Sequence, residues 1–185
     1  QGGIIIADDG LTTGAPNRIT FDSITVTFQN DQSAGDADGT GIDLTSTGGS
    51  SDEHELVNLD IQGDTDASGD IAVDVDSTNT VAFDGNGASS ASSISGVDTG
   101  LRIQDADGLN DDTDFASVST AGNVTGTTFT DIGSGQAIQV QSSATLDSNS
   151  DVVFDQIDVD TSPSATAIDF DDSGTNLEVK ESEFG

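Results

Sequence analysis

The sequence predicts an all-β fold in which short parallel strands stack as a solenoid of about five to six coils. Three observations support this prediction. A short strand pattern with alternating apolar residues recurs along the chain at nearly constant separation. The acidic residues are 30 Asp against five Glu, and Asp favours turns whereas Glu favours helices. No stretch carries the apolar stripe of an amphipathic helix.

The recurring strand alternates apolar and polar residues, as expected of a strand with one buried face. It is found as TGIDLTS (40–46), DIAVDVDS (70–77), TGLRIQDA (99–106), QAIQVQSS (136–143) and TAIDFDDS (166–173). The separations between its copies, measured from Ile42, Ile71, Leu101, Ile138 and Ile168, are 29, 30, 37 and 30 residues. Such spacing indicates a repeat protein, in which each unit buries its apolar side only by stacking on its neighbours.

A second family of strands lies between these copies. Its members are RITFDSITVTF (18–28), ELVNLDIQ (55–62), TVAFDG (80–85), TGTTFTDI (125–132) and VVFDQIDV (152–159). Asparagines introduce several of them, at Asn17, Asn79, Asn149 and Asn176. Asn tolerates the left-handed backbone of sharp corners, so we expect corners at these positions. The remaining segments, such as residues 86–96, are rich in Gly, Ser and Asp and are expected to be loops.

Strand pairs recurring about every 30 residues, with Asn corners and loops of variable length, resemble the right-handed parallel β-helix of pectate-lyase-like proteins and of many surface and viral proteins. The resemblance covers nearly the whole chain and concerns the architecture, with no catalytic motif of one family. It implies a single domain over residues 1–185 in the form of a single-stranded parallel β-helix. The main alternative is an antiparallel β-sandwich, which also has short, regularly spaced strands.

The charge of the chain restricts its partners. The formal net charge is -32, from 35 acidic and three basic residues. Such a surface repels nucleic acids and anionic membranes and attracts cations. No segment approaches the roughly 20 apolar residues of a membrane span. The absence of cysteine and the richness in Gly, Ser, Thr and Asp suit an extracellular surface protein, and the acidity suits a salt-rich, halophilic setting.

The two ends of the sequence contain unfinished strand patterns. The first carries Ile4, Ile5 and Ile6, and the last carries Leu177, Val179 and Phe184. The last residues followed by the first, EFGQGGIIIADDG, align without a gap on the internal stretch DIGSGQAIQVQSS (131–143). We therefore expect copies of the chain to stack head to tail through these six residues, because a heterologous contact of this kind generates filaments. Three alternatives remain open: the chain is a segment of a longer β-helix, its own loops cover both ends, or the match to the internal stretch is chance.

Two acidic stretches are candidate calcium sites. The first contains Asp64, Asp66, Ser68 and Asp70 at alternate positions, and the second contains Asp105, Asp107, Asp111 and Asp112. Calcium takes six to eight oxygen ligands, which Asp and Ser around a glycine bend supply. The bidentate Glu and the flanking helices of an EF-hand are missing. The alternative is that a turn-rich chain with this many Asp residues produces such spacing by chance.

Other residues give weaker functional signals. Arg102, with Asp98, Asp105 and Asp107 nearby in sequence, is the one cluster that fits a polysaccharide lyase, while paired carboxylates would be needed by a hydrolase. The lack of Trp and Tyr counts against such an enzyme, since sugars stack on aromatic rings. His54 is expected in a solvated turn. Asn123 lies in an NVT glycosylation pattern.

These observations favour a non-catalytic, extracellular structural subunit that assembles with copies of itself into a filament or surface fibre. Calcium or high salt would neutralise its carboxylates. A polysaccharide-active enzyme of the same fold is the second hypothesis, and an adhesin or viral spike domain is the third.

Overall fold

The computed structural model describes residues 3–8, 18–28, 39–46, 53–63, 69–77, 80–84, 92–105, 113–116, 127–141, 151–155, 157–161, 163–171 and 176–185. These ranges contain strands, turns and bends but no helix, so the predicted all-β class is confirmed for them. Every strand pairing among them is parallel. The antiparallel sandwich is therefore wrong.

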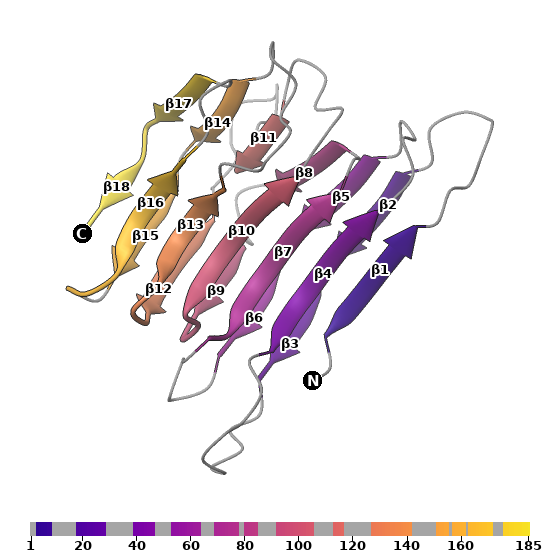
Figure 1. Cartoon of the computed structure of the whole chain (residues 1–185), viewed down its shortest axis with the longest axis horizontal. Coiled ribbons are helices and arrows are strands. Elements are labelled where there is room, and N and C mark those ends of the chain that lie inside the picture. The colour runs from indigo at the N-terminus through magenta and orange to yellow at the C-terminus, as the bar shows by residue number, and fades with distance from the viewer. Residues whose placement is uncertain are drawn as a thin grey trace.

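Two of the sheets have six strands each and run the length of the molecule (Figure 1). Sheet 1 contains β1 (Ile4–Asp8), β4 (Thr40–Ser46), β7 (Ile71–Ser77), β10 (Thr99–Asp105), β13 (Gln136–Val140) and β16 (Thr166–Phe170), in this order. Sheet 4 contains β3 (Thr25–Thr27), β6 (Asp60–Gln62), β9 (Ser93–Ser95), β12 (Thr128–Ile132), β15 (Asp158–Thr161) and β18 (Glu183–Phe184).

The other two sheets have three strands each. Sheet 2 contains β2 (Arg18–Asp22), β5 (Glu53–Val57) and β8 (Thr80–Asp84). Sheet 3 contains β11 (Thr113–Ala116), β14 (Asp151–Asp155) and β17 (Asn176–Lys180). Strands β8 and β11 lie side by side, so sheets 2 and 3 follow one another along the same side of the molecule (Figure 1).

The chain visits these sheets in a fixed rotation. It passes from sheet 1 to sheet 2 or 3, then to sheet 4, and then back to sheet 1 beside the strand it left. Each set of three successive strands is termed a coil here. A parallel neighbour requires a crossover of a dozen or more residues, and the repeat length seen in the sequence supplies it.

Residues at equivalent positions form columns across sheets 1 and 4. The first column contains Ile4, Ile42, Val73, Leu101, Ile138 and Ile168. The second column contains Ile6, Leu44, Val75, Ile103, Val140 and Phe170. The third column, in sheet 4, contains Val26, Ile61, Ile94, Phe129, Val159 and Phe184. Side chains from the middle of all three columns meet in one buried core.

A column that is polar except for its first member, Ile5, lies between the first two and is termed the polar column. It contains Ile5, Asp43, Asp74, Arg102, Gln139 and Asp169. Successive side chains of a strand point to opposite faces, so this column lies on the outer face of sheet 1. A slip of one residue would move charged groups into the core, and the alternation therefore fixes the register of each coil.

The second family of predicted strands needs correction, because sharp corners divide several of them. Ser23, Asn58 and Glu181 have positive φ angles of 58°, 52° and 43°. Each lies two residues before a strand of sheet 4, so the backbone turns there from one sheet to the next. The predicted strands 18–28 and 55–62 are each two strands for this reason.

Two other predictions from the sequence are also wrong. The expected loop 86–96 contains strand β9, whose central residue Ile94 is fully buried. The expected turn residue His54 lies within strand β5, at the register position between Ile19 and Val81. Both segments are short and polar, and pairing with neighbouring coils makes them strands despite their composition.

Candidate functional site

Burial decreases at both ends of the apolar columns. The four middle members of each column are at most 1% exposed. In the first column, Ile4 and Ile168 at the two ends are only half-buried. In the third column, Val26 is half-buried and Phe184 is 46% exposed. An internal coil covers each column member from two sides, whereas the outermost coils receive a neighbour on one side only.

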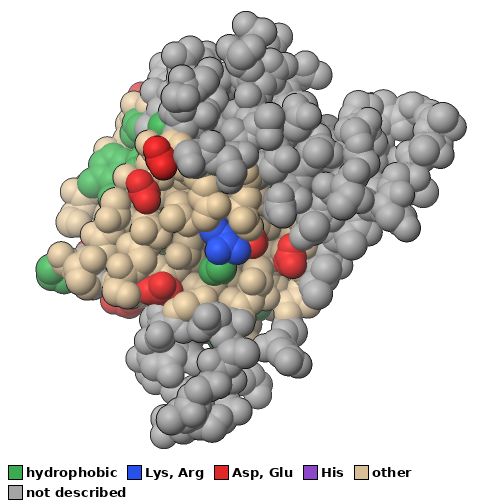
Figure 2. All heavy atoms as spheres, in the orientation of Figure 1, with side chains coloured by type: hydrophobic (Ala, Val, Ile, Leu, Met, Phe, Trp, Pro, Cys, Tyr) green, Lys and Arg blue, Asp and Glu red, His purple; other side chains and the backbone are tan. Residues whose placement is uncertain are grey.

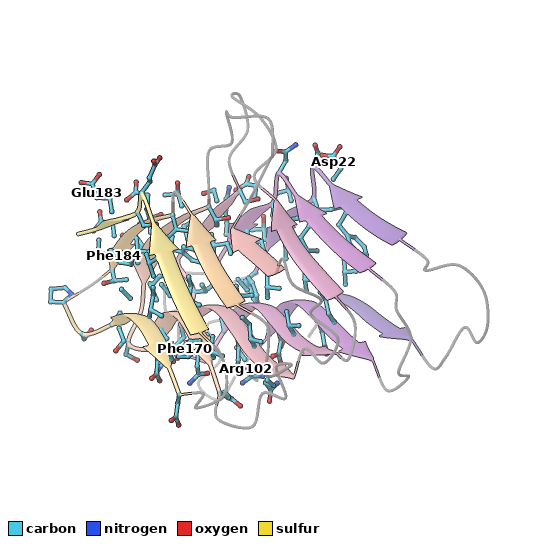
Figure 3. The ribbon with its side chains drawn as sticks, turned by 90° about the horizontal axis from the view of Figure 1, so that it is seen from above. Asp22, Arg102, Phe170, Glu183 and Phe184 are labelled. Atoms are coloured by element: carbon cyan, nitrogen blue, oxygen red, sulfur yellow. The ribbon has the colours of Figure 1, made fainter. Side chains whose placement is uncertain are left out.

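The C-terminal face consists of the outer edges of β16, β17 and β18. Val179 and Phe184, 42% and 46% exposed, are the exposed large apolar side chains among those that the structure describes. Phe170 and Ile168 on β16 are half-buried against the core. Figure 3 shows Phe170 and Phe184 toward this end of the molecule, and apolar side chains gather there on the surface in Figure 2. Leu177 is placed in β17 by its backbone alone.

The N-terminal face consists of the outer edges of β1, β2 and β3. Its described apolar side chains are half-buried and are those of Ile4, Phe21, Ile24, Val26 and Phe28. The next coil inward has Leu59 and Ile61 at no more than 1% exposure. Both faces thus present apolar groups that the inner coils bury.

The gap-free alignment of the two ends of the sequence on residues 131–143 is wrong in its register. It matches Ile5 to Ile138, but the structure places Ile5 in the polar column, opposite Asp43, and places Ile4 in the column of Ile138. It matches Phe184 to Ile132, whereas Phe184 shares the column of Phe129. Loops of different length separate the strands in each coil, so an alignment without gaps cannot keep both strands in register.

Arg102 pairs with a carboxylate that sequence proximity did not indicate. Its Nε donates to Asp74 Oδ1 at 3.0 Å and its Nη2 donates to Asp74 Oδ2 at 2.5 Å. Gln104 Nε2 donates to the same carboxylate at 2.9 and 3.1 Å. Asp74 is 7% exposed, so Arg102 and Gln104 together satisfy a buried charge. The strand repeat was the available signal, because Arg102 and Asp74 occupy one register position in adjacent coils.

Of the acidic neighbours first considered for Arg102, only Asp98 has a described side chain. Asp98 accepts hydrogen bonds from the backbone N–H and the Oγ of Ser134, at 3.0 and 3.1 Å. Asp105 lies at the end of β10 by its backbone, and Asp107 falls outside the described residues. Arg102 is labelled in Figure 3, and the space-filling view of Figure 2 shows a basic side chain with acidic side chains near it.

The calcium candidates fall mostly outside the described part of the chain. Asp64, Asp66 and Ser68 lie there, as do Asp107, Asp111 and Asp112. Asp70 is described and is 8% exposed, and its Oδ1 accepts a hydrogen bond from the backbone N–H of Gly39 at 3.0 Å. Among the described residues, no group of three or more His, Cys, Asp or Glu side chains is arranged to hold a metal ion.

Asn123 also lies outside the described residues, and its glycosylation stays a prediction. In the ranges that the structure describes, no helix has the length and apolarity needed to span a membrane.

Comparisons with known proteins returned no relatives. No protein-family model matches the chain, and neither a curated protein nor a solved structure shows significant similarity to it.

Proposed function

We propose that the chain is a single-stranded parallel β-helix and acts as an extracellular structural subunit that stacks head to tail into a filament. The rotation of the chain through sheet 1, sheet 2 or 3, and sheet 4 supports the architecture, because each rotation adds one strand to the side of its predecessor. A solenoid of this kind contacts only its nearest neighbours along the axis. Further coils therefore add at an end without rearranging the middle.

The burial gradient along the columns carries this proposal. Val179 and Phe184 are each a little under half exposed, and covering them contributes about 1–2 kcal/mol each. Association of two proteins costs about 4–15 kcal/mol in lost freedom and ordering. The two side chains alone therefore do not hold a junction. Strand addition along three sheet edges supplies main-chain hydrogen bonds as well, so assembly depends on protein concentration.

The charge of the chain opposes this assembly at low salt. With a net charge of -32, two copies repel one another when their ends approach. The screening length is about 10 Å at 0.1 M salt and about 3 Å at 1 M. Filaments are therefore expected in molar salt or with calcium, which neutralises carboxylates, and not in dilute buffer.

The test is electron microscopy and light scattering of the 185-residue chain. Samples in dilute buffer are compared with samples in molar NaCl and with samples in CaCl2 before and after chelation. The expected result is fibres one molecule wide in high salt. The Phe184→Asp variant is expected to lose them while its Tm stays within about 2 °C of the wild type, since the side chain is exposed. The matched control is Glu183→Gln, a change at the neighbouring exposed position.

Two outcomes count against the proposal. Monodisperse monomers under all of these conditions would show that the chain does not assemble by itself and would leave a longer β-helix as the better interpretation. Release of unsaturated uronides from an acidic glycan would instead indicate a lyase. In the proposed non-catalytic role, no such release occurs.

A further inference from the structure

We propose a strand-by-strand register for the junction between two copies, an inference that rests on the proposed stacking. Strand β1 of a second copy adds to β16, its β2 adds to β17, and its β3 adds to β18. The junction therefore extends three sheet edges at once. The partner is a second copy of this chain because its N-terminal face continues all of the columns that the C-terminal face presents.

The columns of sheet 1 and sheet 4 set this register. In sheet 1, continuing the first column places Ile4 of the second copy on Ile168, and continuing the second places Ile6 on Phe170. In sheet 4, continuing the third column places Val26 of the second copy on Phe184. Each of these pairs joins two apolar residues, as in every internal coil. A slip of one residue would instead place Ile5 on a core position and move Ile4 outward.

The third edge, β2 on β17, has the same pattern of apolar positions. Both strands have five residues, with apolar ones at the second and fourth positions. Phe21 of the second copy then lies on Val179, and Ile19 lies on Leu177. Phe21 is half-buried and Val179 is 42% exposed in the single chain, so the junction covers surface that each copy leaves accessible.

The charges at the junction are compatible with this register. Internal pairings include the acid pairs Asp43–Asp74 and Asp158–Glu183. At the junction, Glu183 lies opposite Thr25 of the second copy, and Asp169 lies opposite Ile5. Lys180 lies opposite Asp22, a position that resembles the internal pairing of Asp155 with Lys180. No strand position of β16, β17 or β18 pairs acid with acid, although the chain has 35 acidic residues. Like charges directly opposite one another destabilise a strand pair, so the positions within β16, β17 and β18 avoid a penalty that the interior accepts. Beyond β16 the same register matches Asp8, the last residue of β1, to Asp172.

Disulfide trapping tests the register directly because the chain has no cysteine. The matched variant carries Thr25→Cys and Glu183→Cys, two exposed positions on the outer face of sheet 4. In the proposed junction their Cα atoms lie about 5 Å apart, the spacing of adjacent strands, which a disulfide bridges. The offset control carries Thr27→Cys and Glu183→Cys, whose Cα atoms lie about 8 Å apart in the same junction, beyond the reach of a disulfide.

The expected result, in the salt that gives fibres, is a ladder of disulfide-linked multimers from the matched variant on a non-reducing gel. The offset control is expected to give less than a tenth of this product. The Glu183→Cys single variant is expected to stay monomeric on the gel. Cross-linking of the single variant would reveal tail-to-tail stacking and would overturn the proposal, as would stronger cross-linking of the offset control.

A pair of substitutions in β1 separates the register from the stacking itself. Ile4→Asp places a charge in the first column and is expected to raise the concentration needed for assembly at least tenfold. Ile5→Asp places it in the polar column and is expected to change that concentration less than twofold. The reverse order, with wild-type fibres present, would show that stacking occurs in another register. If the wild type forms no fibres under any condition, the proposed function fails first.

Discussion

At the scale of single residues, glycines set how closely adjacent coils approach. A Cβ atom added at Gly63 would lie 1.8 Å from the carbonyl oxygen of Gly96 and 2.3 Å from its carbonyl carbon. The backbone N–H of Gly63 donates to the carbonyl of Ser95 in the same neighbouring coil, at 2.7 Å. The contact involves main-chain atoms on both sides, so no side-chain rotation relieves it.

The Gly63→Ala variant is therefore expected to lose about 3 kcal/mol in its free energy of unfolding, at the upper end of overpacking costs. Gly185→Ala is the matched control, because a Cβ there would meet its nearest atom at an ordinary 3.7 Å. Urea denaturation followed by far-ultraviolet circular dichroism measures both, since the chain has no Trp or Tyr for fluorescence. A loss of less than about 0.5 kcal/mol in Gly63→Ala would mean that the two coils approach less closely than described.

The Arg102–Asp74 pair shows what the sequence leaves undetermined at this scale. The sequence analysis grouped Arg102 with Asp98, Asp105 and Asp107, all within a few residues of it, as a candidate lyase cluster. The observed partner lies 28 residues away, in the adjacent coil. On a stacked strand, the closest outer-face neighbours come from the coils before and after, so proximity in the sequence does not identify Asp74 as a partner of Arg102.

At the scale of elements, the corners decide where one strand ends and the next begins. Asn58 connects β5 to β6 with a φ of 52°, and its Nδ2 donates to Asp22 Oδ1 in the preceding coil at 3.1 Å. The same role falls to Ser23 in the preceding coil and to Glu181 near the C-terminal face. None of these three corners is at an asparagine where the sequence predicted one. Asn176 is the first residue of strand β17, and Asn17, Asn79 and Asn149 lie outside the described residues.

Substitutions at Asn58 separate its tolerance of a left-handed backbone from its hydrogen bond to Asp22. A β-branched residue with a left-handed backbone is strained by roughly 1–2 kcal/mol, and the lost hydrogen bond adds about 1 kcal/mol. Asn58→Val is therefore expected to lose about 2–3 kcal/mol of unfolding free energy.

Asn58→Gly, which keeps the backbone accessible, is the companion variant and is expected to lose about 1 kcal/mol or less. The free energy of unfolding of both variants is measured by urea denaturation. Equal losses in the two would show that strain of the left-handed backbone does not contribute to the effect of Asn58→Val.

The sequence predicted the strands of sheet 1 better than the short strands of the other sheets. The five strands of sheet 1 that follow β1 have five to seven residues with clear alternation, and all five were predicted at their places. Strands β9 and β11 were missed, since one has three residues and the other four, mostly Ser, Thr and Asp. Such short segments have little strand preference of their own. They become strands because neighbouring coils offer hydrogen-bond partners: β9 pairs with β6 and β12, and β11 pairs with β14.

At the scale of the whole molecule, an apolar core opposes a surface of one charge sign. The apolar core side chains lie together in one buried cluster. The chain that surrounds this core carries a net charge of -32. Self-repulsion of this size destabilises the compact state. The stability of the fold should therefore depend on the ions around it.

Raising NaCl from 0.1 M to 1 M is expected to increase the Tm of the chain by about 3–8 °C, because screening weakens this repulsion. Differential scanning calorimetry at a protein concentration too low for assembly measures the effect. A Tm that falls or stays level as NaCl rises would show that charge repulsion is not a significant term in the stability.

The calcium arm of the same experiment keeps the ionic strength constant. A specific site at Asp64–Asp70 adds a saturable increase in Tm, and the Asp64→Asn/Asp66→Asn variant is expected to lose that increase while it keeps the response to NaCl. An increase that is equal in wild type and variant would assign calcium to diffuse binding.

The sequence by itself determined the all-β class, the repeat and the identity of most core residues, because alternation and turn composition are local properties of the chain. The tertiary structure decided the register: that Ile4 and not Ile5 continues the apolar column, that Asp74 pairs with Arg102, and that Phe184 shares a column with Phe129. Register depends on how loops of unequal length bring one coil onto the next. That information lies between the strands, in contacts that form only when the coils stack.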